Sequence, residues 1–269
     1  MKLKNRIGIY MIATNKYTYL LNQVIQRLEF LMENELNLQI TVVVATDDSE
    51  YIDKNSSELR NLKITTHEIP SYGWPEATIL RYQILLGCSG FEEFDFCFYL
   101  DCDMYVHRLF MHEAIRNLKD GQVGMVKHPG FTIDPTFKGI MNALTDYKII
   151  KFLISNFRKQ KFRLGTWEDR SQSSAYVPVK MRRSYVHGAF WFARPQEFKQ
   201  MCTILAQRTQ EDFDKGIVAV WHDESHLNYY SANYPVTILD SRFSWISNYR
   251  NIKHLSPFIS SVIKDETYR

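Results

Sequence analysis

The sequence predicts an α/β fold with a mostly parallel, Rossmann-like central sheet. Short apolar strands alternate with helical patterns through the first half of the chain, which is typical of βαβ units. The 269 residues are 45% hydrophobic and 14% aromatic, enough to bury a full core. Only 11 are glycine and 8 are proline, which is too few for a fibrous or disordered chain.

Each element is predicted from its own pattern. Apolar or β-branched runs bounded by polar turns predict strands, and Leu, Ile and Val at helical spacing predict helices. Strands are expected over residues 6–12, 40–45, 64–69, 94–100, 123–126 and 183–193. Helices are expected over residues 17–33, 77–86, 137–157, 195–206 and 223–230. Since no internal repeat, low-complexity tract or Gly/Ser linker divides the chain, we expect a single domain over residues 1–269.

The positive charge is concentrated in one segment. The chain has a net charge of +3, yet residues 135–165 hold seven Lys and Arg against one Asp, so the remainder is slightly acidic. A nucleic-acid binder usually spreads its basic residues over a docking face, so we expect no nucleic-acid partner. Apolar residues recur every three or four positions over 137–157, with lysines and an arginine beside them as far as residue 161, which predicts a basic amphipathic helix. We expect this helix to contact an anionic membrane surface; the alternative is that it packs on the core.

The cysteines and the apolar runs indicate a compartment. The four cysteines show no CxxC spacing and lie in or beside apolar segments, which favours a reducing environment over a disulfide framework. No apolar run reaches the ~18 residues that span a bilayer, and no signal-type segment follows Met1. We therefore expect a cytoplasmic protein, peripheral at the inner membrane face.

Two carboxylates follow the buried strand over 94–100. Asp101 and Asp103 alternate with Cys102, and such a pair can bind a hard divalent cation that keeps open positions for phosphate oxygens. One alternative is a solvated acidic turn. Another is a phosphatase of the haloacid-dehalogenase type, although Tyr105 stands where that family has Thr or Val, and its motif normally ends the first strand.

A second dense cluster of polar groups spans residues 221–228, with the sequence WHDESHLN. On a helix, Glu224 and Asn228 share one face, and so do His222 and His226. The pattern lacks the HExxH arrangement of a zinc protease. An ordinary helix N-terminus, with acidic residues beside the dipole, is the alternative to a site.

Several separated motifs resemble those of glycosyltransferase family 6 and follow that family's order. These are Gly73-Trp74-Pro75 with Arg81, Asp101-Cys102-Asp103, His128-Pro129-Gly130-Phe131, residues 173–178, residues 185–190 and residues 221–228. The resemblance covers residues 6–245, with 135–165 as an insertion. It implies a single-domain GT-A fold with a nucleotide-sugar-binding half at 1–110 and an acceptor-side half at 111–269.

The resemblance also implies an activity. Family members transfer galactose or N-acetylgalactosamine from a UDP-sugar to the 3-hydroxyl of a galactose-terminated glycan or glycolipid, fucosylated in some cases, with retained anomeric configuration. Because many bacterial relatives replace both motif aspartates and work without metal, the retained Asp101 and Asp103 imply Mn²⁺ dependence, with Mg²⁺ as the alternative. Because the sequence shows no family-type N-terminal anchor or stem, we expect either a bacterial-type cytoplasmic member or an excised catalytic domain, and the inserted segment favours the first. A non-catalytic sugar-binding relative remains the competing hypothesis.

Residue roles carry over by position. The resemblance assigns Asp101 and Asp103 to the metal, Arg81 and Asp223 to the donor sugar, and Glu224 to the β-face of that sugar as nucleophile or charge stabiliser. Donor and acceptor contacts are expected from Tyr17, His128, His187, Gly188, Ala189, Trp221, Lys264 and Arg269. Tyr17 matches the uracil-stacking tyrosine, and His128 and Trp221 match acceptor-side residues.

Two positions refine these roles. The triplet His187-Gly188-Ala189 aligns with the family's donor-selecting residues, where alanine in third place favours UDP-galactose because its methyl crowds a 2-acetamido group. Lys264 and Arg269 are the candidates for the family's C-terminal Lys and Arg that close over the pyrophosphate.

Overall fold

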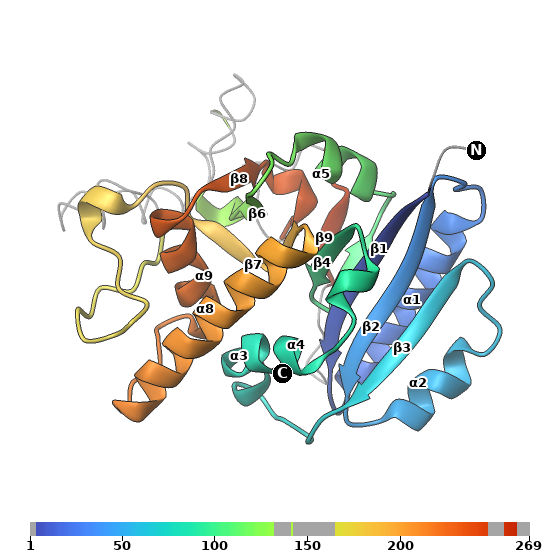
Figure 1. Cartoon of the computed structure of the whole chain (residues 1–269), viewed down its shortest axis with the longest axis horizontal. Helices are drawn as coiled ribbons and strands as arrows, with labels where there is room; N and C mark the ends of the chain where they lie inside the picture. The colour runs from blue at the N-terminus through green and yellow to red at the C-terminus, as the bar shows by residue number, and fades with distance from the viewer. Residues whose placement is uncertain (1–3, 132–140, 142–164, 247–255, 263–269) are drawn as a thin grey trace.

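The computed structural model describes residues 4–131, 141, 165–246 and 256–262. In this part of the chain, a seven-stranded sheet with the order β3-β2-β1-β4-β7-β6-β8 confirms the predicted α/β class (Figure 1). Its strands are β1 (Asn5–Ala13), β2 (Leu38–Thr46), β3 (Leu62–Glu68), β4 (Phe96–Leu100), β6 (Val123–Lys127), β7 (Val186–Ala193) and β8 (Val236–Leu239). A two-stranded sheet pairs β5 (Met104–Val106) with β9 (Ile259–Ser261).

The seven-stranded sheet is mostly parallel. Strands β3, β2, β1 and β4 run in one direction, and β6 runs parallel to β8. Only β7, among the described strands of this sheet, is antiparallel to both of its neighbours. Its amino-terminal end therefore lies beside the carboxyl end of β4. That places residues at the start of β7 at the sheet edge where ligands bind in α/β folds.

Helices cover both faces of the sheet (Figure 1). One core cluster packs α1 against the strands through residues such as Leu21 and Leu28, and the other packs α4, α8 and α9 through Tyr82, Phe198 and Leu227. The longer helices are α1 (Tyr17–Met32), α2 (Ser49–Ser56), α4 (Arg81–Gly87), α5 (Met111–Asn117), α8 (Pro195–Asp214) and α9 (His222–Asn233). The arrangement is consistent with a GT-A type single domain.

Several predicted boundaries differ from the observed ones. The helix predicted over 77–86 is two short helices, α3 (Glu76–Ile79) and α4, because the backbone leaves helical geometry at Leu80 (φ −86°, ψ 5°). Helix α8 continues to Asp214, past the predicted end at 206, since no glycine or proline interrupts it before Gly216. The strand predicted over 183–193 begins at Val186.

The short elements were not predicted. Strands β5, β8 and β9 have three or four residues each, too few to show a periodic pattern. Strand β9 nevertheless matters for the site. It pairs with β5, and the backbone N–H of Val262 donates to the carbonyl of Asp103 at 2.9 Å. The chain near its C-terminus is thereby fixed beside the acidic pair.

The predicted amphipathic helix over 137–157, and the membrane-contact segment 137–161 that includes it, lie outside the described residues, apart from Met141. Its membrane contact thus stays a prediction, as does the division of the chain into halves at residue 110. In the described ranges, no helix has both the length and the apolar character needed to cross a membrane.

The two described ends of the chain that flank residues 132–164 meet on one side chain. The ring centroid of Phe131 lies 5.1 Å from that of Tyr185, and the ring of Trp167 lies 5.2 Å from it. Both contacts are close to perpendicular, at 79° and 85°. Tyr185 and Trp167 are almost fully buried in a small core cluster that includes Val177. A rigid aromatic base therefore holds both ends together.

Packing across β6 and β7 predicts a stability effect. Gly124 lies directly beneath Phe192, and a Cβ atom at this position would overlap the ring. Gly124→Ala should lower the free energy of unfolding by about 1–3 kcal/mol, because both residues are in the closed interior of the sheet. Gly87→Ala is the matched control, since nothing lies within 4 Å of the added atom. Denaturant melts that show equal stability for the two variants would contradict this packing.

Candidate active site

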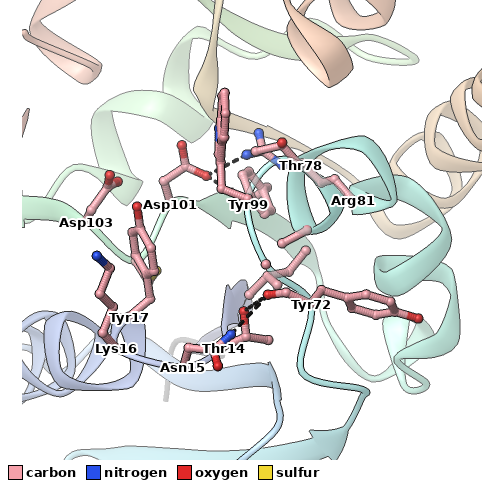
Figure 2. Close-up of a pocket in the computed structure, with 15 residues that line it drawn as sticks. Thr14, Asn15, Lys16, Tyr17, Tyr72, Thr78, Arg81, Tyr99, Asp101 and Asp103 are labelled. Carbon is pink, nitrogen blue, oxygen red and sulfur yellow. Dashed lines mark hydrogen bonds and ion pairs between the residues drawn. The ribbon is translucent and has the colours of Figure 1, made fainter. Parts of the chain in front are cut away.

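A cavity of about 890 Å³ opens at the carboxyl ends of β1 and β4 (Figure 2). Its walls come from the loops after β1, β3 and β4 and from α3 and the start of α4. The lining residues are Ile12, Thr14, Asn15, Lys16, Tyr17, Tyr72, Gly73, Trp74, Ala77, Thr78, Arg81, Tyr99, Asp101, Cys102 and Asp103. Four of the predicted site residues, from three separate segments, therefore share one cavity.

Asp101 is oriented by three contacts. Its Oδ1 accepts hydrogen bonds from the hydroxyl of Tyr99 at 2.5 Å and from Nη2 of Arg81 at 3.0 Å. Its backbone N–H donates to the carbonyl of Ala189 at 3.0 Å, which ties the turn after β4 to β7. Both side-chain contacts use Oδ1. Within the described residues, Oδ2 has no hydrogen bond and is the oxygen that a ligand could take.

Arg81 joins the turn after β4 to helix α9. Its Nη1 lies 2.6 Å from Oδ2 of Asp223 and 2.9 Å from the carbonyl of Gly188, while Nη2 binds Asp101. The guanidinium also stacks on Tyr99, 4.6 Å from the ring centroid. The Arg81 side chain is only 7% exposed, so its charge acts in a medium where ion pairs are strong.

Helix α9 presents two consecutive carboxylates to β7. Oε2 of Glu224 accepts the backbone N–H of Gly188 at 2.8 Å. Asn228, one turn later, exchanges two hydrogen bonds with the backbone of Val186, at 2.8 and 2.9 Å. Because Gly188 has no side chain, the helix approaches closely: a Cβ there would lie 3.3 Å from both Asp223 Oδ2 and Glu224 Cβ. The predicted pairing of Glu224 with Asn228 on one helical face is confirmed.

Burial changes the proton affinity of both carboxylates. Desolvation raises the pKa of Glu224 to about 7, although the hydrogen bond from Gly188 opposes the change. Desolvation also raises the pKa of Asp223 to about 6, against the attraction of Arg81. Perturbed carboxylates of this kind are concentrated at functional sites.

Two histidines, His128 and His187, lie close to Glu224. The rings of His128 and His187 are 4.8 Å apart and nearly perpendicular. His187 Nδ1 lies 2.6 Å from Oγ of Ser244, and Nδ1 of His128 accepts the N–H of Gly130. Desolvation lowers the pKa of His187 to about 4 and that of His128 well below 6.5. Both rings are therefore neutral at pH 7.

The side chains offer two kinds of metal ligand. Asp101 and Asp103 supply carboxylate oxygens to the cavity, a donor set that suits Mn²⁺ or Mg²⁺. His128, His187 and Glu224 each have a ligand atom within 4.8 Å of the other two. However, the Gly130 N–H occupies the Nδ1 lone pair of His128, which places the proton of the neutral ring on Nε2. The aspartate pair is thus the better fit for a hard cation.

The remaining predicted residues lie in different surroundings. Tyr17 begins α1 and lines the cavity, and Trp221 stands at the N-cap of α9 with half of its surface exposed. Ala189 is 5% exposed and packs in the core cluster beneath α1. Lys264 and Arg269 lie outside the described residues.

Several residues of the site were not predicted. Tyr99 binds Asp101 and supports Arg81, the Tyr82 hydroxyl donates to the carbonyl of Asp223 at 3.0 Å, and Ser244 holds His187. Trp74 was part of a recognised motif, but its place in the cavity wall was not foreseen. The position of Tyr99, two residues before Asp101 on the same strand face, is the one signal in the sequence that could have indicated such a role.

The raised pKa of Glu224 predicts a pH-dependent stability. A carboxyl group whose pKa is raised on folding stabilises the protein fully below its unfolded value near 4.5, and this contribution is lost as the pH rises through about 7. Glu224→Gln should therefore match the wild type near pH 4 and exceed its free energy of unfolding by about 1–3 kcal/mol at pH 8. The exposed Glu58→Gln is the control. Denaturant melts showing a pH-independent difference would refute the assignment.

Comparison with known proteins places the chain in a family. The family model described as "Glycosyltransferase family 6" matches residues 131–267, about half of the chain. A chicken protein named "Globoside alpha-1,3-N-acetylgalactosaminyltransferase 1" is 24% identical over 254 residues, which cover 91% of this chain and 63% of the relative.

Shorter matches come from two other organisms. The rat "Histo-blood group ABO system transferase 2" is 38% identical over 89 residues, or 33% of this chain and 26% of the relative. The Escherichia coli "O-antigen biosynthesis glycosyltransferase WbnI" is 31% identical over 86 residues, or 32% of this chain and 37% of the relative. In each of these alignments the match spans less than two thirds of the relative's length. Because the family model matches about half of the chain and the motifs follow the family's order, the chain belongs to glycosyltransferase family 6.

Proposed function

We propose that this chain is a retaining α-1,3-glycosyltransferase that transfers galactose from UDP-galactose to the 3-hydroxyl of a galactose-terminated glycan. The observation that carries the proposal is the double ion pair of Arg81, which brings Asp101 and Asp223 to one guanidinium. Two acidic pairs, from opposite halves of the chain, thereby face one site. The name of the chicken relative, an α-1,3-N-acetylgalactosaminyltransferase, supports the proposed α-1,3 linkage.

The cavity suits a nucleotide diphosphate. Its volume of about 890 Å³ is in the range of small-molecule sites. Tyr17 offers an aromatic ring for the uracil, as the family resemblance implies, and Asp101 and Asp103 line the same cavity (Figure 2). Lys16 lies beside Tyr17 in the wall and supplies positive charge near the position of the phosphates.

We include Mn²⁺ in the proposal, held by Asp101 and Asp103. A bound divalent cation offsets the negative charge that grows on a departing pyrophosphate. Residues of the chain orient the carboxylates that would hold this cation. Arg81 fixes the orientation of Asp101 through Oδ1 and leaves Oδ2 for a ligand. The hydroxyl of Tyr99 also donates to Oδ1 of Asp101.

Glu224 supplies negative charge where the sugar becomes positive. Its carboxylate is held by the N–H of Gly188 and is partly buried, so a positive charge nearby is stabilised more strongly than it would be in bulk water. Desolvation raises its pKa to about 7, which disfavours the ionised form. A cationic centre that develops beside it lowers this pKa and so favours the carboxylate. Asp223 is positioned by Arg81 and Tyr82 to bind sugar hydroxyls.

The choice of donor rests on the start of β7. Gly188 lies against Asp223 and Glu224, and Ala189 follows it. We propose UDP-galactose as the preferred donor, from the alanine at the third position of the triplet. The name of the chicken relative makes UDP-N-acetylgalactosamine the donor to compare with it. A single methyl group discriminates by about 10–200-fold at most, so both donors must be measured side by side.

The decisive experiment is release of UDP from each donor, with and without Mn²⁺, in the presence of lactose as a galactose-terminated acceptor. We expect turnover that requires the acceptor and the metal, and Glu224→Gln should lose at least about 100-fold in kcat while UDP affinity is kept. If the wild-type chain binds lactose and UDP but releases no UDP beyond the Glu224→Gln background, it is a non-catalytic sugar-binding relative. A phosphatase role has no support, since the aspartates follow β4 and not the first strand.

The acidic pair allows a separate prediction. Asp103→Ala should abolish Mn²⁺-stimulated turnover, a loss of at least about 100-fold, because it removes one of the two carboxylates that would hold the cation beside the anionic leaving group. The fold should survive, since Asp103 follows the end of β4. Manganese binding, followed by electron paramagnetic resonance, should weaken in parallel. The exposed Asp53→Ala on α2 is the control. Equal turnover of wild type and Asp103→Ala with Mn²⁺ would exclude the metal role.

A further inference from the structure

An exposed aromatic surface adjoins the cavity. Trp74, in the loop before α3, is 77% exposed, and Trp221 and Val220 are each 50% exposed. His222 follows Trp221 in the chain, and its ring is 5.7 Å from that of Trp74, at an angle of 80°. We call this surface the aromatic rim, made of Trp74, Val218, Val220, Trp221 and His222. Exposed apolar groups that form a continuous patch commonly mark a binding site.

Hydrogen bonds to backbone groups hold the rim in place, while its side chains face solvent. Oε2 of the buried Glu168 accepts the N–H of Val220 at 2.8 Å, and Arg170 donates to the carbonyl of Val218 at 2.7 Å. His222 has a positive φ of 45°, a conformation that is costly for a residue with a side chain. Its N–H donates to Ala219 at 3.0 Å. The surrounding contacts therefore maintain a strained conformation that presents the imidazole to Trp74.

The rim is continuous with both parts of the proposed active site. Trp74 also lines the cavity that contains Asp101 and Arg81. Trp221 and His222 directly precede the carboxylates of Asp223 and Glu224 on α9. A glycan whose terminal sugar reaches these carboxylates must extend outward, and the rim is the surface beside that path.

The chemistry of the rim favours a sugar ring over other occupants. None of its five residues is a lysine, arginine, aspartate or glutamate, so it lacks the positive charge that an anionic membrane or a nucleic acid would require. Indole rings are large, rigid and amphipathic, and they bind flat apolar surfaces with little loss of conformational entropy. The C–H face of a pyranose ring is such a surface, and its hydroxyl edge can bond to the imidazole of His222.

We propose that Trp74 and His222, together with Trp221, bind the second sugar ring of the glycan acceptor, so that the chain selects acceptors longer than one sugar. This inference rests on the proposed function, in that the first ring is taken to lie at Asp223 and Glu224. It adds two residues, Trp74 and His222, to the acceptor side of the site.

The test is a binding measurement that does not depend on turnover. With UDP and Mn²⁺ present, calorimetry gives the affinity of the wild-type chain for methyl β-galactoside and for two galactose-terminated disaccharides, with β1-3 and β1-4 linkages. We expect a disaccharide to bind at least about tenfold more tightly than the single sugar. Trp74→Ala should remove this advantage, measured as the ratio of the disaccharide affinity to the affinity for methyl β-galactoside at saturating UDP, a ratio that an effect of this cavity-wall residue on UDP binding alone would not change. Trp74→Phe should keep part of it.

The matched control is Phe30→Ala, which removes another exposed aromatic side chain, 63% exposed at the end of α1 and outside the cavity wall. It should bind every sugar as the wild type does. The proposal is overturned if neither disaccharide binds more tightly than the single sugar, or if Trp74→Ala weakens UDP and all sugars equally, which would place Trp74 on the donor side. A chain that shows the Trp74-dependent advantage but releases no UDP would keep this site and refute the proposed transferase.

Discussion

The buried ion pairs of Arg81 are the interaction on which the rest of the site depends. The arginine comes from α4, while its partners lie 20 residues further along at Asp101 and on α9 at Asp223. No other described contact joins the turn after β4 directly to the carboxylates of α9 through a single side chain. Removing one partner of a buried ion pair typically costs about 3–5 kcal/mol, because a charge is left uncompensated. One guanidinium thus orients one carboxylate of each acidic pair, Asp101 and Asp223.

This arrangement leaves an excess of negative charge. Asp101, Asp103, Asp223 and Glu224 lie around one arginine, and burial raises the pKa of the two carboxylates on α9. Carboxylates that are costly to ionise when buried become favourable partners once a cationic species arrives. The same electrostatics therefore explain the destabilisation expected at high pH and the affinity proposed for a metal and for a positively charged sugar. The buried carboxylates that are proposed to bind cationic species are thus the same ones that lower the stability at high pH.

The sequence predicted the fold class and much of the site because both are encoded in short patterns. The apolar strands, the acidic pair after β4 and the WHDESHLN segment each stand out within ten residues. What could not be predicted depends on distant contacts. The carbonyl of Gly188 is 107 residues from Arg81, and Tyr82 reaches Asp223 across 141 residues. The break at Leu80 likewise has no glycine or proline to announce it; it directs Arg81 inward.

The aromatic base at Tyr185 has a consequence for how this protein could be altered. Because Phe131 and Trp167 both pack on that one ring, the ends of the segment between them are already brought together by the folded domain. For a flexible linker substituted between these two residues, the entropic cost of closure rises by only about 0.6 kcal/mol for each doubling of its length. Segments of very different length and composition can therefore be exchanged at this point with little thermodynamic penalty. Variation in this segment would therefore be tolerated, while the sheet and its buried arginine stay unchanged.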